Sequence, residues 1–238
     1  ITQLNDKKIE KFSFKNKAEI NKAIDQVNSK KFNINDISSK VVNRNPSGPF
    51  TTSTLQQVSS GRLGFGASRT MQIAQKLYQG IEIDGETIGL ITYMRTDGTN
   101  LSTDAIDTFR KYIKNEFGDE YVPDNAASYS GKKAKNAQEA HEAIRPTDIM
   151  RAPGTVKKYL SPDQHKLYDL IWSRALSSQM KPAQFDRNTI TISSDDNRTI
   201  CKVSGSVIKF DGFLRVMKDT KKDEDEDILP EMNKGPIN

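Results

Sequence analysis

The sequence of 238 residues has little cysteine, little histidine and no long apolar run. Its single cysteine, Cys201, excludes an internal disulfide and a cysteine-based zinc site, and fits a protein of a reducing cytosol. No stretch approaches the ~20 apolar residues of a membrane-spanning helix, so we expect a cytoplasmic protein with no membrane partner. The polar, hairpin-like N-terminus does not fit a signal peptide.

The sequence also lacks a nucleotide-binding loop and a convincing metal site. No GxxxxGK segment followed by Ser or Thr occurs, which excludes that phosphate-binding cradle for a nucleoside triphosphate. The acidic run Asp223–Asp227 follows Lys221 and Lys222, and such a mixed run is far more often a solvated loop than a Mg²⁺ site. We therefore predict no metal ligands in this chain.

The charge balance is basic, with 36 Lys and Arg against 31 Asp and Glu, a net charge of +5 and a pI of about 9.1. This balance suits a polyanionic partner without proving one. The first residue is Ile1 rather than Met, so we expect a fragment of a longer chain.

Both ends of the chain have strand-like patterns. Asn5-Asp6 marks a hairpin turn, and Asn16 with Glu19 predicts the capped start of a helix over 17–28. Near the other end, three runs alternate with period two, with Gly205 and Asp211-Gly212 as expected turns. These runs are 189–193, 199–203 and 207–210. We predict one β-rich domain formed by residues 1–48 and 183–238.

The middle of the chain, 49–182, reads as mainly helical. A short helix is expected after Thr51, ended by Gly61 and Gly64, and a second helix over Arg69–Gln79 with Ser68 as its cap. A strand over 87–92 completes the order of a winged helix-turn-helix. Two later helices begin at Ser102 and Ser161. The predicted fold class is therefore α+β, with a winged-helix domain inserted into a β-rich one.

One segment of this middle part, Gly89–Asn100, places Tyr93, Arg95 and Asp97 at alternate positions. Alternate residues of an extended segment share a face. A phenol is mostly protonated at neutral pH and needs a cationic neighbour to act as a nucleophile, which Arg95 supplies. The guanidinium also suits two-pronged binding of a phosphate, while Asp97 is better placed to orient Arg95 or cap a turn. Taken alone, a core-packed Tyr93 beside a surface Arg95 is the commoner outcome of such a pattern.

A second candidate segment, Ala137–Thr147, contains His141 and, four residues later, Arg145. A histidine N–H donates well to phosphate, and Pro146 disfavours a helix beyond Arg145. Taken alone, a surface histidine without a role is the commoner outcome here too.

Three separated segments together resemble the type IA DNA topoisomerases. They are Pro49–Gln57 with Leu63-Gly-Phe65 after it, the Gly89–Asn100 segment, and Gln138–Thr147. Lys166–Trp172 and Asp211-Gly212 match more weakly. The order and spacing of these segments agree along essentially the whole chain. Met94, between Tyr93 and Arg95, resembles the residue at this position in the bacterial topoisomerase I branch of the family.

The resemblance implies a role for each matching residue. Tyr93 would form a 5′-phosphotyrosine bond on single-stranded DNA, Arg95 would contact the scissile phosphate, and His141 would support it electrostatically. Residues implied to maintain the local geometry are Thr96, Asp97, Glu142 and Arg145. The β-rich ends resemble the family's arch and the helical insert its catabolite-activator-like domain. Gly98 stands where the family usually has serine, a difference that removes a side-chain hydrogen bond beside the tyrosine.

The family also implies partners that this chain lacks. Its Mg²⁺ ion is bound by an acidic toprim domain, which nothing here resembles, and its zinc ribbons need more than one cysteine. We therefore expect that a monomer of this fragment alone neither cleaves nor relaxes DNA. We expect weak, salt-dependent binding of single strands through basic residues. These residues are Arg69, Lys132, Lys133 and Lys135.

Three alternatives remain open on the sequence. A non-enzymatic winged-helix protein would read duplex DNA with the Arg69–Gln79 helix. An interaction module would carry partners and make no use of Tyr93. A tyrosine recombinase is a poorer match, because that family needs several arginines and histidines around a tyrosine near the chain end.

Overall fold

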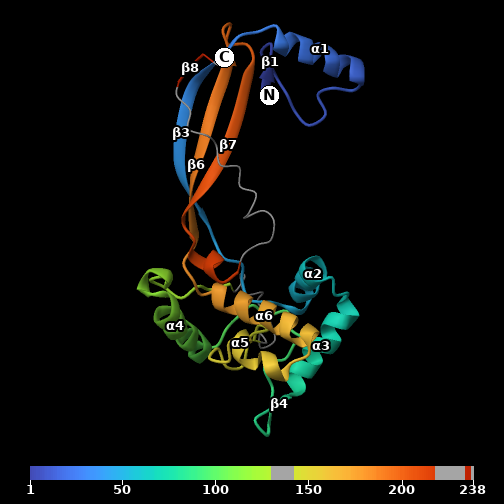
Figure 1. The fold of residues 1–238 in the computed structure, drawn as a ribbon, viewed down its shortest axis with the longest axis vertical. Helices are drawn as coiled ribbons and strands as arrows, with labels where there is room; N and C mark the ends of the chain where they lie inside the picture. The colour runs from blue at the N-terminus through green and yellow to red at the C-terminus, as the bar shows by residue number, and fades with distance from the viewer. Residues whose placement is uncertain (130–141, 218–233, 237–238) are drawn as a thin grey trace, which may run out of the picture. The chain divides into compact units, whose positions relative to one another are not determined.

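The structure is a computed structural model that describes residues 1–129, 142–217 and 234–236. The chain divides into two compact units (Figure 1). The first contains Ile1–Asn43, Gln184–Phe210 and the C-terminal strand, and the second contains Arg44–Ala183 with Asp211–Thr220. Of the residues expected with the β-rich domain, those of Asp211–Thr220 group instead with the helical unit.

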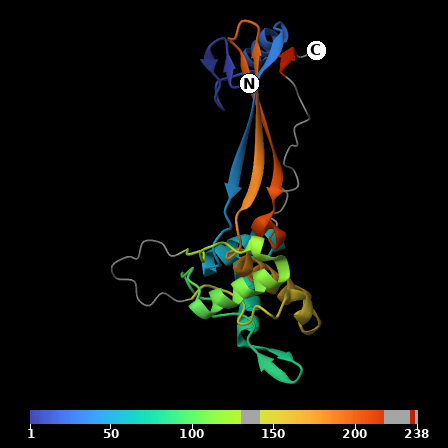
Figure 2. The ribbon, with the colours of Figure 1, turned by 90° about the vertical axis from the view of Figure 1, so that its left-hand side faces the viewer.

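The described residues of the β-rich unit form an antiparallel sheet and a helix. Its strands follow the order β2-β1-β7-β6-β3-β8 within the described residues. The strands are β1 (Gln3–Leu4), β2 (Lys7–Lys8), β3 (Phe32–Arg44), β6 (Ala183–Ser194), β7 (Ile200–Phe210) and β8 (Gly235–Pro236). Figures 1 and 2 both show the long strands β3, β6 and β7 side by side.

Local sequence explains the turns and the helix of this unit. Asn5 and Asp6 take positive φ angles of 49° and 66°, as the tight turn between β1 and β2 requires. Helix α1 (Lys17–Asn28) begins as expected, because the Asn16 side chain accepts the Glu19 N–H at 2.9 Å. The Glu19 carboxylate in turn accepts the Lys15 N–H at 2.8 Å.

The prediction of three short C-terminal strands was wrong. Two long strands, β6 and β7, pair along most of their lengths, and Gly205 lies inside β7 opposite Asn188 rather than in a turn. Glycine weakens a strand but does not end it when the ladder continues on both sides. The turn lies instead at 195–199, where Asn197 has a φ of 56°.

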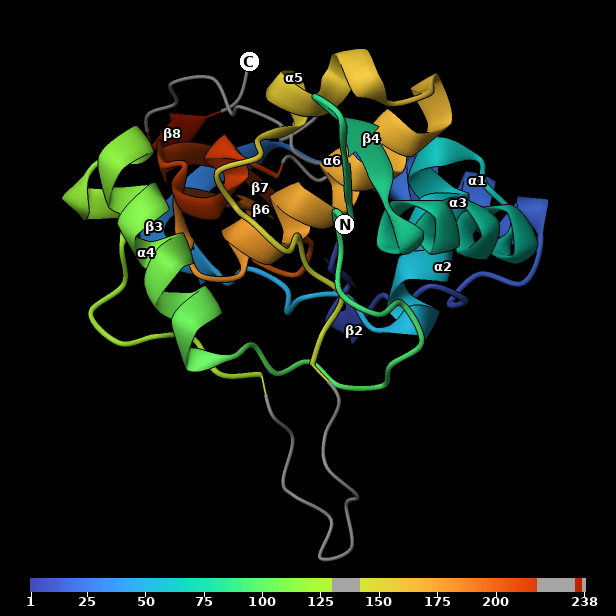
Figure 3. The same ribbon diagram turned by 90° about the horizontal axis from the view of Figure 1, so that it is seen from below.

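The helical unit is built around α6 (Pro162–Ser177), whose side chains form much of the core. Its other elements are α2 (Thr52–Leu63), α3 (Ala67–Gln79), β4 (Ile81–Ile83), β5 (Glu86–Ile88), α4 (Thr103–Phe117), η1 (Asp119–Tyr121), α5 (Pro153–Val156), η2 (Lys157–Tyr159) and η3 (Gly212–Arg215). Figure 3 shows α3 and α4 on opposite sides of α6. Tyr112 of α4 meets Trp172 of α6 edge to face, with ring centroids 5.6 Å apart. No helix of the described residues is long and apolar enough to span a bilayer.

Several predicted boundaries in this unit were wrong. Gly61 lies within α2, which ends at Gly64 in the left-handed conformation, φ 67°. Helix α3 is capped by Gly66 rather than by Ser68, which lies in its first turn. The expected strand over 87–92 ends at Ile88, because β5 pairs back on β4 in a short hairpin. The starts of α4 at Ser102 and of α6 at Ser161 are confirmed.

Candidate active site

Three segments that lie far apart in the sequence meet through backbone pairing in the helical unit. Ile91 bridges Pro146, Phe50 bridges Ile144, and Asn100 bridges Glu142. The Thr92 N–H donates to the Arg145 carbonyl at 2.9 Å, and the Thr92 hydroxyl donates to the Ala143 carbonyl at 2.7 Å. The segment that carries Tyr93 is therefore held from both sides by residues about fifty positions away.

The Gly89–Asn100 segment alternates between buried and exposed residues after Ile91. Met94 is fully buried and Thr96 is 8% exposed, whereas Tyr93 is 47% exposed and Arg95 and Asp97 are also exposed. The expected period of two is confirmed in the burial pattern, although residues 92–99 belong to no strand. The buried side chains anchor the segment, so Tyr93, Arg95 and Asp97 face solvent together. A core-packed Tyr93 does not occur.

Thr52 fixes the backbone on both sides of Arg95, a contact that the sequence did not reveal. Its hydroxyl lies 2.7 Å from the Met94 carbonyl oxygen and accepts the Thr96 N–H at 2.8 Å. Its own N–H donates to the Thr96 carbonyl at 2.9 Å. The run of hydroxyl residues before α2 was read only as a set of possible caps. Thr51 does cap α2, with a reciprocal bond to Thr54.

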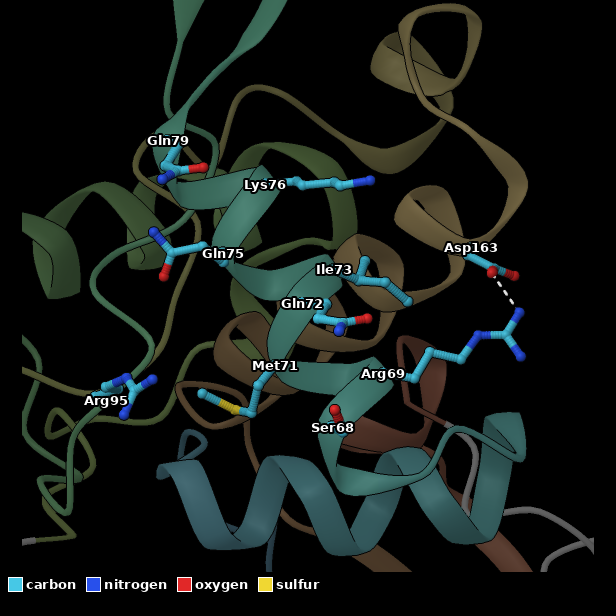
Figure 4. A pocket seen from close by; sticks show the side chains of 10 residues that line it. All are labelled: Ser68, Arg69, Met71, Gln72, Ile73, Gln75, Lys76, Gln79, Arg95 and Asp163. Atoms are coloured by element: carbon cyan, nitrogen blue, oxygen red, sulfur yellow. Dashed lines mark hydrogen bonds and ion pairs between the residues drawn. The ribbon is translucent and has the colours of Figure 1, made fainter.

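Arg95 lies between two hollows of the surface and belongs to the lining of both. One, of about 760 Å³, runs along α3 (Figure 4). The other, of about 510 Å³, is lined by the start of α2 together with Thr96 and Asp97. Arg95 makes no hydrogen bond or ion pair with any described residue, so Asp97 does not orient it by direct pairing, which was one of the two roles expected for Asp97. Its guanidinium is available to an anion.

The ring of Tyr93 rests against a second tyrosine. Tyr78, near the end of α3, contacts it edge to face with ring centroids 5.3 Å apart. Gly89 allows this approach, because a Cβ there would lie 2.7 Å from the Tyr78 carbonyl oxygen. The Leu90 N–H also donates to the Leu77 carbonyl at 2.8 Å. Tyr78 therefore limits the positions of the Tyr93 ring, and no spacing rule in the sequence pointed to it.

Glu142 and Arg145 form a two-pronged ion pair. Arg145 Nε lies 2.7 Å from Glu142 Oε1 and Nη2 lies 3.0 Å from Oε2. Glu142 Oε1 also accepts the N–H of Ser102, the cap of α4, at 2.8 Å. Burial raises the pKa of Glu142, but the hydrogen bonds from Arg145 and Ser102 outweigh it, so the pKa lies below its usual value. This pair ties the start of α4 to the segment that pairs with Thr92.

The remaining predicted site residues are only partly placed. His141, Lys132, Lys133 and Lys135 lie outside the described residues. Arg69 is engaged by an ion pair with Asp163 at 2.5 Å and packs over the Phe65 ring at 4.7 Å.

Thr96 has a local role beside Gly98. Its side-chain oxygen accepts the Gly98 N–H at 2.9 Å, so the Thr96 hydroxyl stabilises a local turn of the backbone. The position where the family usually has serine is therefore bonded through its backbone.

Residues 1–129, 142–217 and 234–236 contain no group of three His, Cys, Asp or Glu side chains that could hold a metal ion. The described residues therefore do not fit a resident Mg²⁺ ion.

The comparisons with known proteins show the family of this chain. The DNA topoisomerase family model matches residues 1–237, and the chain therefore belongs to the bacterial type IA DNA topoisomerases. DNA topoisomerase 1 of Rickettsia bellii is 47% identical over 227 residues, covering 95% of this chain and 28% of that protein. The corresponding protein of Haemophilus influenzae is 44% identical over 225 residues, covering 94% and 24%.

A solved structure supports the same assignment. Full-length topoisomerase I of Thermotoga maritima matches with a TM-score of 0.75 and 36% identity, over 91% of this chain and 34% of that one. The chain thus spans about a quarter to a third of the proteins it resembles.

Proposed function

We propose that this chain is the nucleophile-bearing part of an enzyme that relaxes negatively supercoiled DNA by transient cleavage of one strand. The observation that carries the proposal is the exposed face formed by Tyr93 and Arg95 over the buried Met94 and Thr96. A nucleophile and an unpaired cation on one anchored segment suit attack on a phosphodiester.

The proposed reaction is a transesterification. The Tyr93 hydroxyl oxygen attacks the phosphorus of a single-stranded segment, forming a 5′-phosphotyrosine bond as the bond to the 3′ oxygen breaks. The phenol proton ends on the freed 3′-hydroxyl. One ester replaces another, so the reverse attack reseals the strand without ATP.

Arg95 would bind the scissile phosphate. Negative charge spreads over the equatorial oxygens during phosphoryl transfer, and a preplaced guanidinium stabilises it. The Thr52 contacts keep the Arg95 backbone in place, so little reorganisation accompanies the reaction. We assign His141 a supporting electrostatic role at the same phosphate, and Thr96, Asp97, Glu142 and Arg145 the maintenance of the geometry.

Other parts of the parent chain complete the site in this proposal. A toprim domain would bind Mg²⁺, so the 238 residues alone neither cleave nor relax DNA. They bind single strands weakly as a monomer, with Arg69, Lys132, Lys133 and Lys135 contributing, and affinity falls steeply with salt. The parent protein would act in the bacterial nucleoid. Clear relaxation of DNA by the isolated chain would contradict this proposal.

We further infer that the β-rich unit corresponds to the family's arch, and that α2, α3 and the β4–β5 hairpin form a winged helix-turn-helix. The short turn between α2 and α3 and the hairpin that follows support this assignment. The same elements suit a non-enzymatic module that reads duplex DNA with α3. A preference of the parent protein for duplex over single strands would favour that second function.

The test is relaxation of negatively supercoiled plasmid by the intact parent protein. Tyr93→Phe removes the nucleophilic oxygen and keeps the ring, so we expect loss of all relaxation with unchanged folding. Tyr159→Phe, which removes a hydroxyl bonded to Asp84 in the same unit, is the matched control and should leave relaxation intact. Unaltered relaxation by Tyr93→Phe would mean that the chain has another role.

A further inference from the structure

The hollow along α3 has the chemical character of a nucleic-acid binding groove. Its volume is about 760 Å³, and α3 supplies most of its lining (Figure 4). Three glutamines of α3, Gln72, Gln75 and Gln79, line it, and none of their amides bonds any described residue. A row of free amides offers both donors and acceptors, as base edges require.

The charges that line this groove favour a polyanion. Lys76 and Arg95 contribute two cations that have no ion-pair partner among the described residues. The one carboxylate of the lining, Asp163, is neutralised by Arg69 at 2.5 Å. Phosphates therefore meet a net positive surface beside neutral amides.

The groove includes one residue of the candidate reaction centre, Arg95. Arg95 lines it, and Tyr78 of the same helix touches the Tyr93 ring. Figure 4 shows Gln75, Met71 and Arg95 facing the same space. A strand bound along α3 thus leads to the phosphate that Arg95 would hold.

We propose that this groove binds the downstream DNA nucleotides, those that follow the nucleotide carrying the scissile phosphate on its 3′ side. The inference rests on the proposed function. A 5′-phosphotyrosine bond attaches the downstream strand to the unit that carries Tyr93, whereas the upstream strand ends in a free 3′-hydroxyl with no bond to this unit. Only the downstream nucleotides stay beside α3 while the break is open. Base edges are accessible there because the strand is single.

The test uses the intact parent protein and two single-stranded oligonucleotides with the same upstream sequence and cleavage position. One ends directly after the nucleotide that carries the scissile phosphate, and the other continues downstream. Gln75→Ala and Lys76→Ala are compared with Gln57→Ala and Lys111→Ala, matched exposed residues outside the groove. Dissociation constants and yields of covalent adduct are measured for each pair.

We expect the groove variants to lose roughly 2- to 10-fold in affinity for the long oligonucleotide per lost hydrogen bond. They should be unchanged on the short one, which also shows that they are folded and competent. The control variants should match wild type on both.

Equal losses on both oligonucleotides, no loss on either, or a loss that follows upstream extension would overturn the proposal. The proposal would also be overturned if the parent protein bound duplex DNA more tightly than single strands and the same substitutions removed that preference. If the wild-type protein forms no adduct at all, the proposed function fails instead, whatever the affinities show.

Discussion

The two units of the chain are stabilised in different ways. In the described part of the β-rich unit, the buried apolar residues are few: Leu4, Ala23, Ile34, Phe185 and Ile190. The helical unit buries a much larger set, and its core continues beneath the reactive segment through Leu90, Ile91 and Met94, each no more than 1% exposed. Close packing leaves such a segment little freedom. The comparison teaches that the proposed reactive face, with Tyr93 and Arg95, lies directly over a well-packed core.

The β-rich unit depends more on strand pairing and polar contacts. Lys30 reaches Asn5, Asp196 and Thr199, and Arg198 pairs with Asp6 at 2.6 Å. The Arg198–Asp6 pair is exposed on both sides, and exposed ion pairs contribute little to stability. We therefore expect this unit to tolerate surface changes and to open at a lower free energy than the helical unit.

The largest expected effect tests the thin core of the β-rich unit. Ile190→Ala should lower the stability of this unit by about 2–5 kcal/mol, because the removed side chain is one of few that are buried. Amide hydrogen exchange, read separately for the two units, should show the loss in β6 and its neighbours β3 and β7, and not in the helical unit. Val207→Ala, at a position 46% exposed, is the control and should change little. An equal loss of amide protection in α6 would contradict the expected difference in stability between the two units.

The next effect tests the reactive face of the helical unit. Arg95→Ala in the parent protein should slow single-turnover cleavage by about 10²- to 10³-fold, since one charge-stabilising donor is removed. Arg95→Lys should recover only part of the rate, because lysine lacks the two-pronged geometry. Lys111→Ala, on the exposed face of α4, should have no effect. A wild-type rate in Arg95→Ala would remove Arg95 from the reaction.

A smaller effect tests how the Glu142–Arg145 pair supports the site. The folded state lowers the pKa of Glu142, so its stabilisation is present above the unfolded pKa near 4.5 and is lost as pH falls through the folded value. Glu142→Gln should lower the free energy of unfolding by about 1.5–3 kcal/mol at pH 7. Its difference from wild type should shrink below about pH 4.5. Glu86→Gln is the exposed control, and a pH-independent difference for Glu142→Gln would contradict this account.

The smallest effect tests the contact that positions the tyrosine. Tyr78→Ala should slow cleavage of bound DNA by roughly 2- to 10-fold, the range for loss of one aromatic pair. The dissociation constant for single strands should not change, and Tyr78→Phe should restore the rate. If Tyr78→Ala weakens binding and leaves the rate unaltered, Tyr78 does not position Tyr93.

Much of the fold followed from local signals in the sequence. The caps Asn16, Ser102 and Ser161 start helices where their hydroxyl or amide groups predicted, and Asn5-Asp6 makes its turn. Gly205 was misread, because a glycine inside a long ladder and a glycine at a turn have the same local sequence. Only the pairing with Asn188 on the other strand distinguishes them.

The site was predictable where it depends on spacing and not where it depends on distant contacts. The alternate positions of Tyr93, Arg95 and Asp97 in the sequence predicted that their side chains share one face. The strand expected over 87–92, just before these residues, ends at Ile88, and the hydrogen bonds of Thr92 go to Ala143 and Arg145 instead of to a sheet. The contacts of Thr52 and Tyr78 also join residues separated in sequence, so no periodicity could reveal them.

The central claim is that Tyr93 is the nucleophile. The most direct measurement is to mix the intact parent protein with a labelled single-stranded oligonucleotide and Mg²⁺, denature it rapidly, digest it, and map the DNA-linked peptide by mass spectrometry. The account predicts one adduct, on Tyr93, through a 5′-phosphate. An adduct on another residue, or none from a preparation that relaxes DNA, would contradict it.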